Sequence, residues 1–133
     1  MSWGEIAIVF FVSHLVGDFL FQTDWQARNK EGGLGRNRVA RRALLSHTCF
    51  YGLAFIPALV WVATGAGMAV AVLIALVITL PHMVVDDGRL LIGYMKRFKG
   101  CSEPVPPVLK GAVDQSTHII FLFATALLTA GLA

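Results

Sequence analysis

The sequence predicts an all-α membrane protein in which four transmembrane helices form an up-and-down bundle. Of its 133 residues, 56% are hydrophobic and only 14% are charged, a balance too apolar for a soluble domain of this size. The chain also divides into four apolar stretches, each long enough to cross the hydrocarbon layer of a bilayer. Its basic residues gather beside only two of the connections between these stretches, as expected for loops on one side of a membrane.

The first span is expected at residues 4–22. Trp3 and Trp25 flank it, and tryptophans concentrate at the two membrane interfaces. Thr23 and Gln26 have the spacing of a capping box, in which a hydroxyl and an amide three residues apart close the start of a helix. A short interfacial helix is therefore expected after the first span.

The second span is expected at 43–63, with a kink near Pro57, because proline lacks the N–H that the helix needs. An uncharged Thr-Gly-Ala-Gly turn leads to the third span, at 68–90. A basic and then proline-rich segment, expected to be a loop, precedes the fourth span at 108–132. Residues 1–133 form a single domain in this scheme.

The distribution of charge predicts the topology. All 11 lysines and arginines lie in, or next to, the two longer connections, whereas the opposite side carries both termini and the single charge of Glu5. By the positive-inside rule, the basic connections face the cytoplasm and both termini lie on the non-cytoplasmic side. We expect a multi-pass protein of the bacterial inner (plasma) membrane, with the basic loops against anionic headgroups.

Three polar residues interrupt the first span at a regular spacing. His14, Asp18 and Gln22 are each four residues apart, so they share one face of a helix. An aspartate in the middle of a membrane helix costs about 2.5–3.5 kcal/mol on insertion scales. Ionisable residues inside a membrane span therefore indicate a functional site.

The other spans repeat this pattern. Each carries one of the four histidines of the chain, and two of them add an aspartate one helical turn away. The topology places all of these side chains in the cytoplasmic half of the bundle. The predicted metal ligands are His14, Asp18, His47, His82, Asp86, Asp114 and His118.

Imidazole and carboxylate groups from facing helices are typical of metal sites in helical bundles. We expect one or two divalent ions, zinc, iron or manganese, and a catalytic role for Asp18, Asp86 or Asp114. A second set is expected to orient ligands or to bind substrate: Gln22, Gln115 and Arg89. The alternative is that the polar residues only join helices, but such hydrogen bonds contribute about 0.6 kcal/mol each, less than burying three aspartates costs.

The motifs His14-xxx-Asp18-Phe-xx-Gln22-Thr-Asp-Trp, His82-xxx-Asp86 and Asp114-Gln115-xx-His118 resemble those of a family of small bacterial and phage membrane proteins. That family is catalogued as a domain of unknown function, and the resemblance covers nearly the whole chain. It implies a helical membrane protein and no particular activity. A looser similarity, in residue types alone, is to membrane-bound metal-dependent hydrolases.

The leading functional hypothesis is a membrane-embedded, metal-dependent hydrolase that acts on a lipid-like or phosphorylated substrate. Two alternatives stay open: a module for proton or metal transport, and a non-catalytic small subunit of a larger membrane complex. The expected partners are the lipid bilayer, a lipid-like substrate, and further copies of the chain or other subunits. Nucleic-acid binding is not expected, because membrane orientation already accounts for the basic residues.

Overall fold

The computed structural model describes residues 1–133. The chain is all-helical, with 82% of its residues in helices and no strand. Its elements, in chain order, are α1 (Trp3–Leu15), the π-helix η1 (Val16–Phe21), α2 (Asp24–Asn29), α3 (Arg38–Ala54), α4 (Ile56–Ala66), α5 (Met68–Asp86), α6 (Arg89–Lys99) and α7 (Pro107–Leu132).

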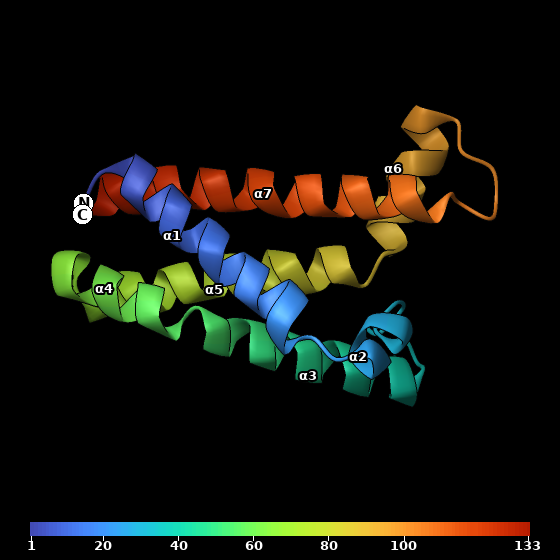
Figure 1. Cartoon of the computed structure of the whole chain (residues 1–133), viewed down its shortest axis with the longest axis horizontal. Helices are drawn as coiled ribbons and strands as arrows, with labels where there is room; N and C mark the ends of the chain where they lie inside the picture. The colour runs from blue at the N-terminus through green and yellow to red at the C-terminus, as the bar shows by residue number, and fades with distance from the viewer.

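The long helices run side by side in four columns: α1 with η1, α3 with α4, α5, and α7 (Figure 1). Three of these columns are single segments long and apolar enough to cross a membrane. The α3–α4 column is the fourth if its two helices, which meet at an angle of 52°, form one span. The predicted all-helical fold is confirmed, and of the four predicted spans three, or four if α3 and α4 count as one, are long and apolar enough to cross a membrane.

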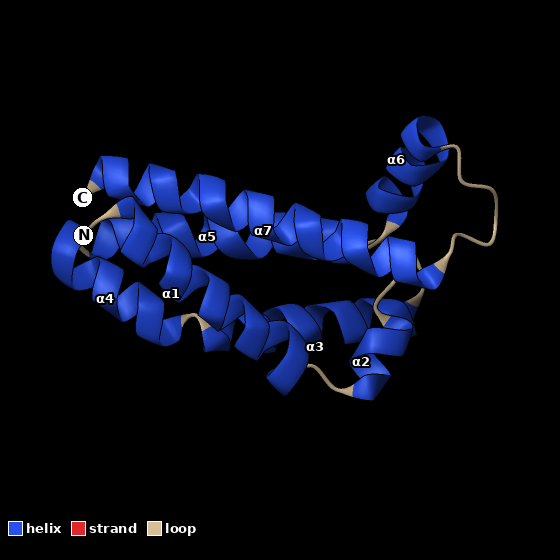
Figure 2. Ribbon diagram, turned by 45° about the horizontal axis from the view of Figure 1, so that its top comes forward, coloured by secondary structure: helices blue, strands red, loops and turns tan.

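Both termini lie at one end of the bundle, beside the turn between α4 and α5 (Figure 1). The short helices α2 and α6 lie at the opposite end, where the basic residues are (Figure 2). The two ends of the molecule therefore differ sharply in charge.

The capping box predicted after the first span is confirmed. The backbone N–H of Gln26 donates to Thr23 Oγ1 at 3.2 Å, and the backbone N–H of Thr23 donates to Gln26 Oε1 at 2.9 Å. These bonds satisfy N–H groups that the first helical turn leaves free. They start α2 immediately after η1 and turn the chain back across the end of the bundle.

The kink predicted in the second span is also present. Helix α3 ends at Ala54, and α4 restarts at Ile56 with Pro57 in its first turn. The start of this span differs from the expected residue 43, because α3 begins at Arg38. The side chain of Asn37 accepts hydrogen bonds from the N–H groups of Val39 and Ala40, which extends the helix through the basic segment.

The third span ends earlier than the predicted residue 90. Helix α5 stops at Asp86, because Gly88 takes the left-handed conformation (φ +78°) that closes helices. A separate helix, α6, then occupies much of the segment expected to be a loop. Its charged residues suggested a loop, but Leu91 and Met95 are buried one turn apart and anchor it to the bundle.

The half of the bundle next to the termini has an apolar core. Aromatic and aliphatic side chains from all four columns fill it, including Ile6, Phe10, Phe55, Val62 and Ile74, all fully buried. Polar side chains replace them toward the basic end. The bundle is thus divided along its length into an apolar half and a polar half.

One glycine allows the first and second spans to approach closely. A Cβ atom at Gly17, in η1, would lie 2.6 Å from Cδ2 of Tyr51 and 3.3 Å from its Cα. Atoms this close overlap, so any side chain at residue 17 would push η1 away from α3.

We therefore expect Gly17→Ala to lower the free energy of unfolding by about 1–3 kcal/mol, because it overpacks the contact with Tyr51. Unfolding in mixed micelles with increasing dodecyl sulfate measures the change. Gly4→Ala is the matched control, since a Cβ there meets nothing within 4 Å. Equal stability of the two variants would contradict the prediction.

Candidate metal centre

The structure brings the four histidines of the chain into one buried cluster. They come from four different columns, on α1, α3, α5 and α7. His14 and His47 have no exposed surface, and His82 and His118 expose only 4% and 2%. Four titratable rings with no access to water form a polar centre inside the bundle.

Asp86, near the end of α5, lies at the middle of this cluster. Its Oδ2 atom is 2.8 Å from Nε2 of His47 and 3.1 Å from Nε2 of His82. Its Oδ1 atom is 3.6 Å from Nε2 of His118. A single carboxylate thus faces three of the four histidines.

Asp18 approaches the same rings from the first span. Its Oδ1 lies 3.4 Å from Nε2 of His47 and 3.6 Å from Nε2 of His82, and its Oδ2 lies 3.6 Å from Nδ1 of His14. Asp18 is within η1, the π-helical turn. Single π-helical turns inside α-helices are frequent at functional sites, because the extra residue changes the direction of the side chains that follow.

Several atoms of the cluster have no hydrogen bond. They include both oxygens of Asp86, Oδ1 of Asp18 and both ring nitrogens of His118, although these oxygens have ring nitrogens within 3.6 Å. The distances are short, but the alignment required for a hydrogen bond is missing. Buried polar atoms normally have partners, so these converging lone pairs fit a bound cation.

Three overlapping groups have the dimensions of a metal site. In each group the candidate ligand atoms lie within 4.8 Å of one another. The groups are His14–Asp18–His82, His47–His82–Asp86 and Asp86–Asp114–His118. His82 and Asp86 each belong to two groups, which fits one ion or two neighbouring ions, and the donor types suit zinc, iron or manganese.

Tyr51 and Gln115 hold the cluster from the side. The Tyr51 ring stacks on His82 with 3.4 Å between ring centroids and 8° between planes. Its hydroxyl lies 3.2 Å from Nδ1 of His14, and Nε2 of His14 lies 3.1 Å from Oε1 of Gln115. Because Oε1 only accepts, Nε2 of His14 carries the proton and Nδ1 accepts from Tyr51.

The amide group of Gln115 also links two carboxylates. Its Nε2 donates to Oδ2 of Asp18 at 3.4 Å and to Oδ2 of Asp114 at 3.3 Å. Gln115 was expected to orient other groups, and the structure places it between these carboxylates and His14. Both ring nitrogens of His14 are therefore in hydrogen bonds, unlike those of the other three histidines.

Lys30 is the residue of the site that the sequence analysis missed. Its Nζ lies 2.8 Å from Oδ2 of Asp86 and donates to Oε1 of Gln22 at 3.1 Å. It caps α2, and the turn after the capping box carries it back over the cluster. One sequence pattern pointed to Lys30: it follows Gln22 closely in the chain, separated only by the short predicted helix.

Arg89 lies outside the cluster. It was expected to orient ligands or to bind substrate, but the turn at Gly88 ends α5 and directs residue 89 away. Its Nε atom donates to Oδ2 of Asp87 at 2.5 Å, and this hydrogen bond raises the pKa of the exposed guanidinium. Asp87 itself is buried and accepts a hydrogen bond from the backbone N–H of Leu34.

A polar pocket of about 240 Å³ connects the cluster with the basic end. Asp114, which is only partly buried, lines it together with Asp86, Lys30 and Lys110. Lys110 pairs with Glu31 on the other wall. Of the three carboxylates in the metal groups, Asp114 is thus the most exposed.

Comparison with known proteins places the chain in a family. Residues 6–132 match the family model described as "Protein of unknown function (DUF3307)". The chain belongs to the DUF3307 family. No curated protein and no solved structure matches this DUF3307 chain, so neither comparison shows a similarity to a hydrolase.

The geometry makes Asp86 a central ligand for a cation, since it belongs to two of the three groups and faces three of the four histidines. We expect Asp86→Asn to weaken divalent-metal binding by at least about 100-fold, more than changes to outer-shell partners do. Calorimetric titration of the metal-stripped protein with zinc or manganese measures the loss. Asp24→Asn, an exposed aspartate paired with Arg28, is the matched control. Unchanged binding by Asp86→Asn would exclude a metal site at this position.

Proposed function

We propose that the protein is a membrane-embedded, metal-dependent hydrolase whose site lies in the cytoplasmic leaflet. The observation that carries the proposal is the convergence of seven histidine and aspartate side chains, from all four columns, on one largely buried cluster in which several ring nitrogens and carboxylate oxygens lack an aligned hydrogen bond. The substrate would be lipid-like or phosphorylated, because the site lies inside a membrane bundle and next to lysine side chains.

A purely structural role explains the cluster less well. Polar residues that join membrane helices work by making hydrogen bonds, yet the oxygens of Asp86 lack an aligned hydrogen bond although Lys30, His47 and His82 lie within 3.1 Å of Oδ2. The ion pair with Lys30 offsets part of the cost of burying Asp86, but burying three carboxylates in a bundle costs more than interhelical contacts return. A site that trades stability for chemistry is the better explanation.

His47, His82 and Asp86 would hold a first divalent ion, with Asp18 and His118 beside them. An ion there would lower the pKa of a bound water molecule and would polarise the scissile bond. Gln115 and Tyr51 hold His14 and the carboxylates in position through the hydrogen bonds described above. The chain's own groups thus provide both the ligands and the fixed surroundings of the site.

Asp114 would act as the general base. It is partly buried, lines the polar pocket, and its candidate ligand atom lies within 4.8 Å of those of Asp86 and His118. A carboxylate between the pocket and the cluster can accept a proton from water as it attacks. Lys30, on the same pocket, presents an ammonium group to an anionic substrate oxygen.

A transport function has less support. A conducting path needs polar groups along the whole bundle, whereas the half next to the termini is filled by fully buried apolar side chains such as Phe10 and Ile74. The hydroxyls of Thr125 and Thr129 in that half donate to carbonyls of their own helix. The polar cluster therefore has access to one end of the bundle only.

The decisive experiment measures metal content and turnover together. Protein purified in detergent is analysed for bound divalent metals and assayed with a panel of phosphate monoesters, lipid phosphates and acyl esters, before and after chelation. Three results together support the proposal. The wild type binds metal, His118→Ala and His14→Ala lose it, and a chelator abolishes turnover. A protein that binds no divalent metal would refute it. Co-purification with stoichiometric partners and no turnover would favour a subunit role instead.

Asp114→Asn separates the base from the ligands. If Asp114 accepts the proton from water, the variant keeps its metal and loses about 100-fold or more in kcat. Metal analysis and initial rates on the same preparation test both parts. Ser116→Ala serves as the control, because that exposed hydroxyl on the same helix donates only to its own helix. Loss of metal in Asp114→Asn would assign Asp114 to the ligands.

We propose that the basic end faces the cytoplasm of a bacterial cell and that both termini lie outside it, in the inner membrane. Eleven basic residues against few charges at the other end support this orientation. A phosphatase fused after Ala133, active only outside the cytoplasm, is expected to be active. The same fusion placed after Gly100 is expected to be inactive, and the reverse pattern would invert the topology.

A further inference from the structure

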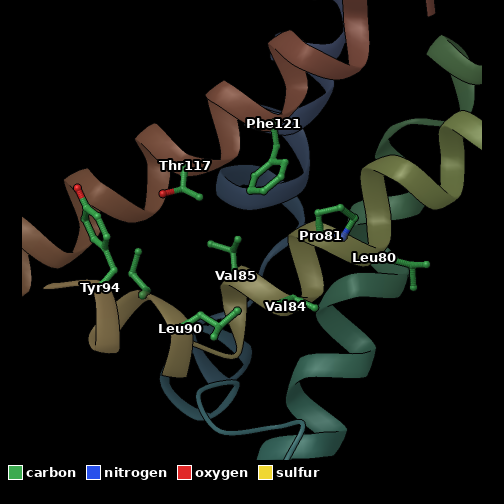
Figure 3. Close-up of a pocket in the computed structure, with 9 residues that line it drawn as sticks. Leu80, Pro81, Val84, Val85, Leu90, Tyr94, Thr117 and Phe121 are labelled. Atoms are coloured by element: carbon green, nitrogen blue, oxygen red, sulfur yellow. The ribbon is translucent and has the colours of Figure 1, made fainter. Parts of the chain in front are cut away.

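An apolar groove of about 650 Å³ lies between α5, α6 and α7 (Figure 3). Side chains of all three helices line it, with Val85 of α5 at its centre, Tyr94 of α6 on one side and Phe121 of α7 on another. Its volume is within the range of about 300–1,000 Å³ that ligand pockets occupy. Almost its whole lining is hydrocarbon, so it selects for an apolar occupant.

The groove borders the candidate metal centre. Val85 lines the groove and also the polar pocket that contains Asp86, Asp114 and Lys30. Phe121 lines the groove and the small cavity beside His82 and His118. Single side chains therefore separate an apolar compartment from the His/Asp cluster.

Helix α6 gives the depth of the groove in the membrane. Its exposed apolar residues, Leu90, Tyr94 and Phe98, are four residues apart and so share a face, while its last turn carries three basic residues. This is the pattern of an amphipathic helix that lies in the membrane interface. Leu90 and Tyr94 also line the groove, which places it where lipid chains meet their headgroups.

A second apolar groove provides an internal comparison. It has about 570 Å³ and lies against α1, α3 and α4, lined by residues such as Val12, Leu53 and Trp61. It shares no lining residue with the polar pocket and contains no histidine or aspartate. A lipid chain in this second groove would be an ordinary neighbour of the bundle.

We propose that the groove between α5, α6 and α7 binds one hydrocarbon chain of a lipid whose headgroup enters the polar pocket beside Asp86 and Lys30. Val85 and Leu91 line both spaces, so a molecule with an apolar chain and a polar head is the chemistry that fits both at once. Calling this lipid the substrate rests on the proposed hydrolase function; its binding does not.

Photolabelling tests the proposal without turnover. The full chain is reconstituted in vesicles of phosphatidylethanolamine and phosphatidylglycerol, in which a small share of the phosphatidylglycerol carries a diazirine on one acyl chain. After irradiation, mass spectrometry maps the labelled residues. Labelling is expected to concentrate on the residues that line the groove of α5, α6 and α7, above those that line the groove of α1, α3 and α4.

Val84→Phe fills the groove, because Val84 lines it and does not line the polar pocket. We expect it to lower labelling of the groove about tenfold. Val72→Phe is the matched control: it is the same change on the exposed part of the same helix, at a residue that lines neither groove. A circular-dichroism spectrum and a gel-filtration profile equal to those of the wild type show that Val84→Phe is folded.

The outcomes separate the two proposals. Concentrated labelling that Val84→Phe removes supports the lipid groove, even if no hydrolysis is ever detected. Equal labelling of the two grooves, or labelling that Val84→Phe leaves unchanged, would overturn it while leaving the metal centre untouched. Loss of labelling with Val72→Phe as well would show a general effect of bulk on lipid contact and would likewise overturn it.

Discussion

The polar half of this bundle depends on one buried carboxylate. Asp86 is 5% exposed and lies within 3.6 Å of three histidines and of Lys30, each supplied by a different segment of the chain. A charge taken out of water must be compensated by its neighbours. The second, third and fourth spans and the α2 turn are thus held together around one residue, and a failure at Asp86 would leave all of them with unpaired polar groups.

This constraint explains why the molecule is divided along its length. The half next to the termini packs aromatic and aliphatic side chains into an apolar core. The other half contains buried carboxylate oxygens and ring nitrogens without hydrogen bonds. These atoms lower the stability of the fold but can bind a cation. An apolar half that supports a polar half, in which carboxylate oxygens and ring nitrogens lack hydrogen bonds, is the arrangement expected of a preorganised site.

The two short helices give this site its surroundings. Helix α2, started by the capping box at Thr23, brings Lys30 over the cluster. Helix α6, separated from α5 by the left-handed turn at Gly88, covers one side of the apolar groove. With these two helices, the site gains a polar pocket on one side and an apolar compartment on the other.

The sequence by itself determined the helical membrane fold, the kink at Pro57, the capping box at Thr23 and the convergence of histidines and aspartates in one half of the bundle. The kink and the capping box depend on local hydrogen bonding, and the membrane fold depends on overall composition. The convergence follows from the helical period together with the charge pattern that orients the spans. The tertiary structure decided the position of Lys30, the placement of Arg89 outside the cluster and the existence of α6. Each depends on the direction that a loop gives the chain. The turn at Gly88 and the packing of α2 and α6 against the bundle depend on contacts between distant parts of the sequence, which local patterns do not specify.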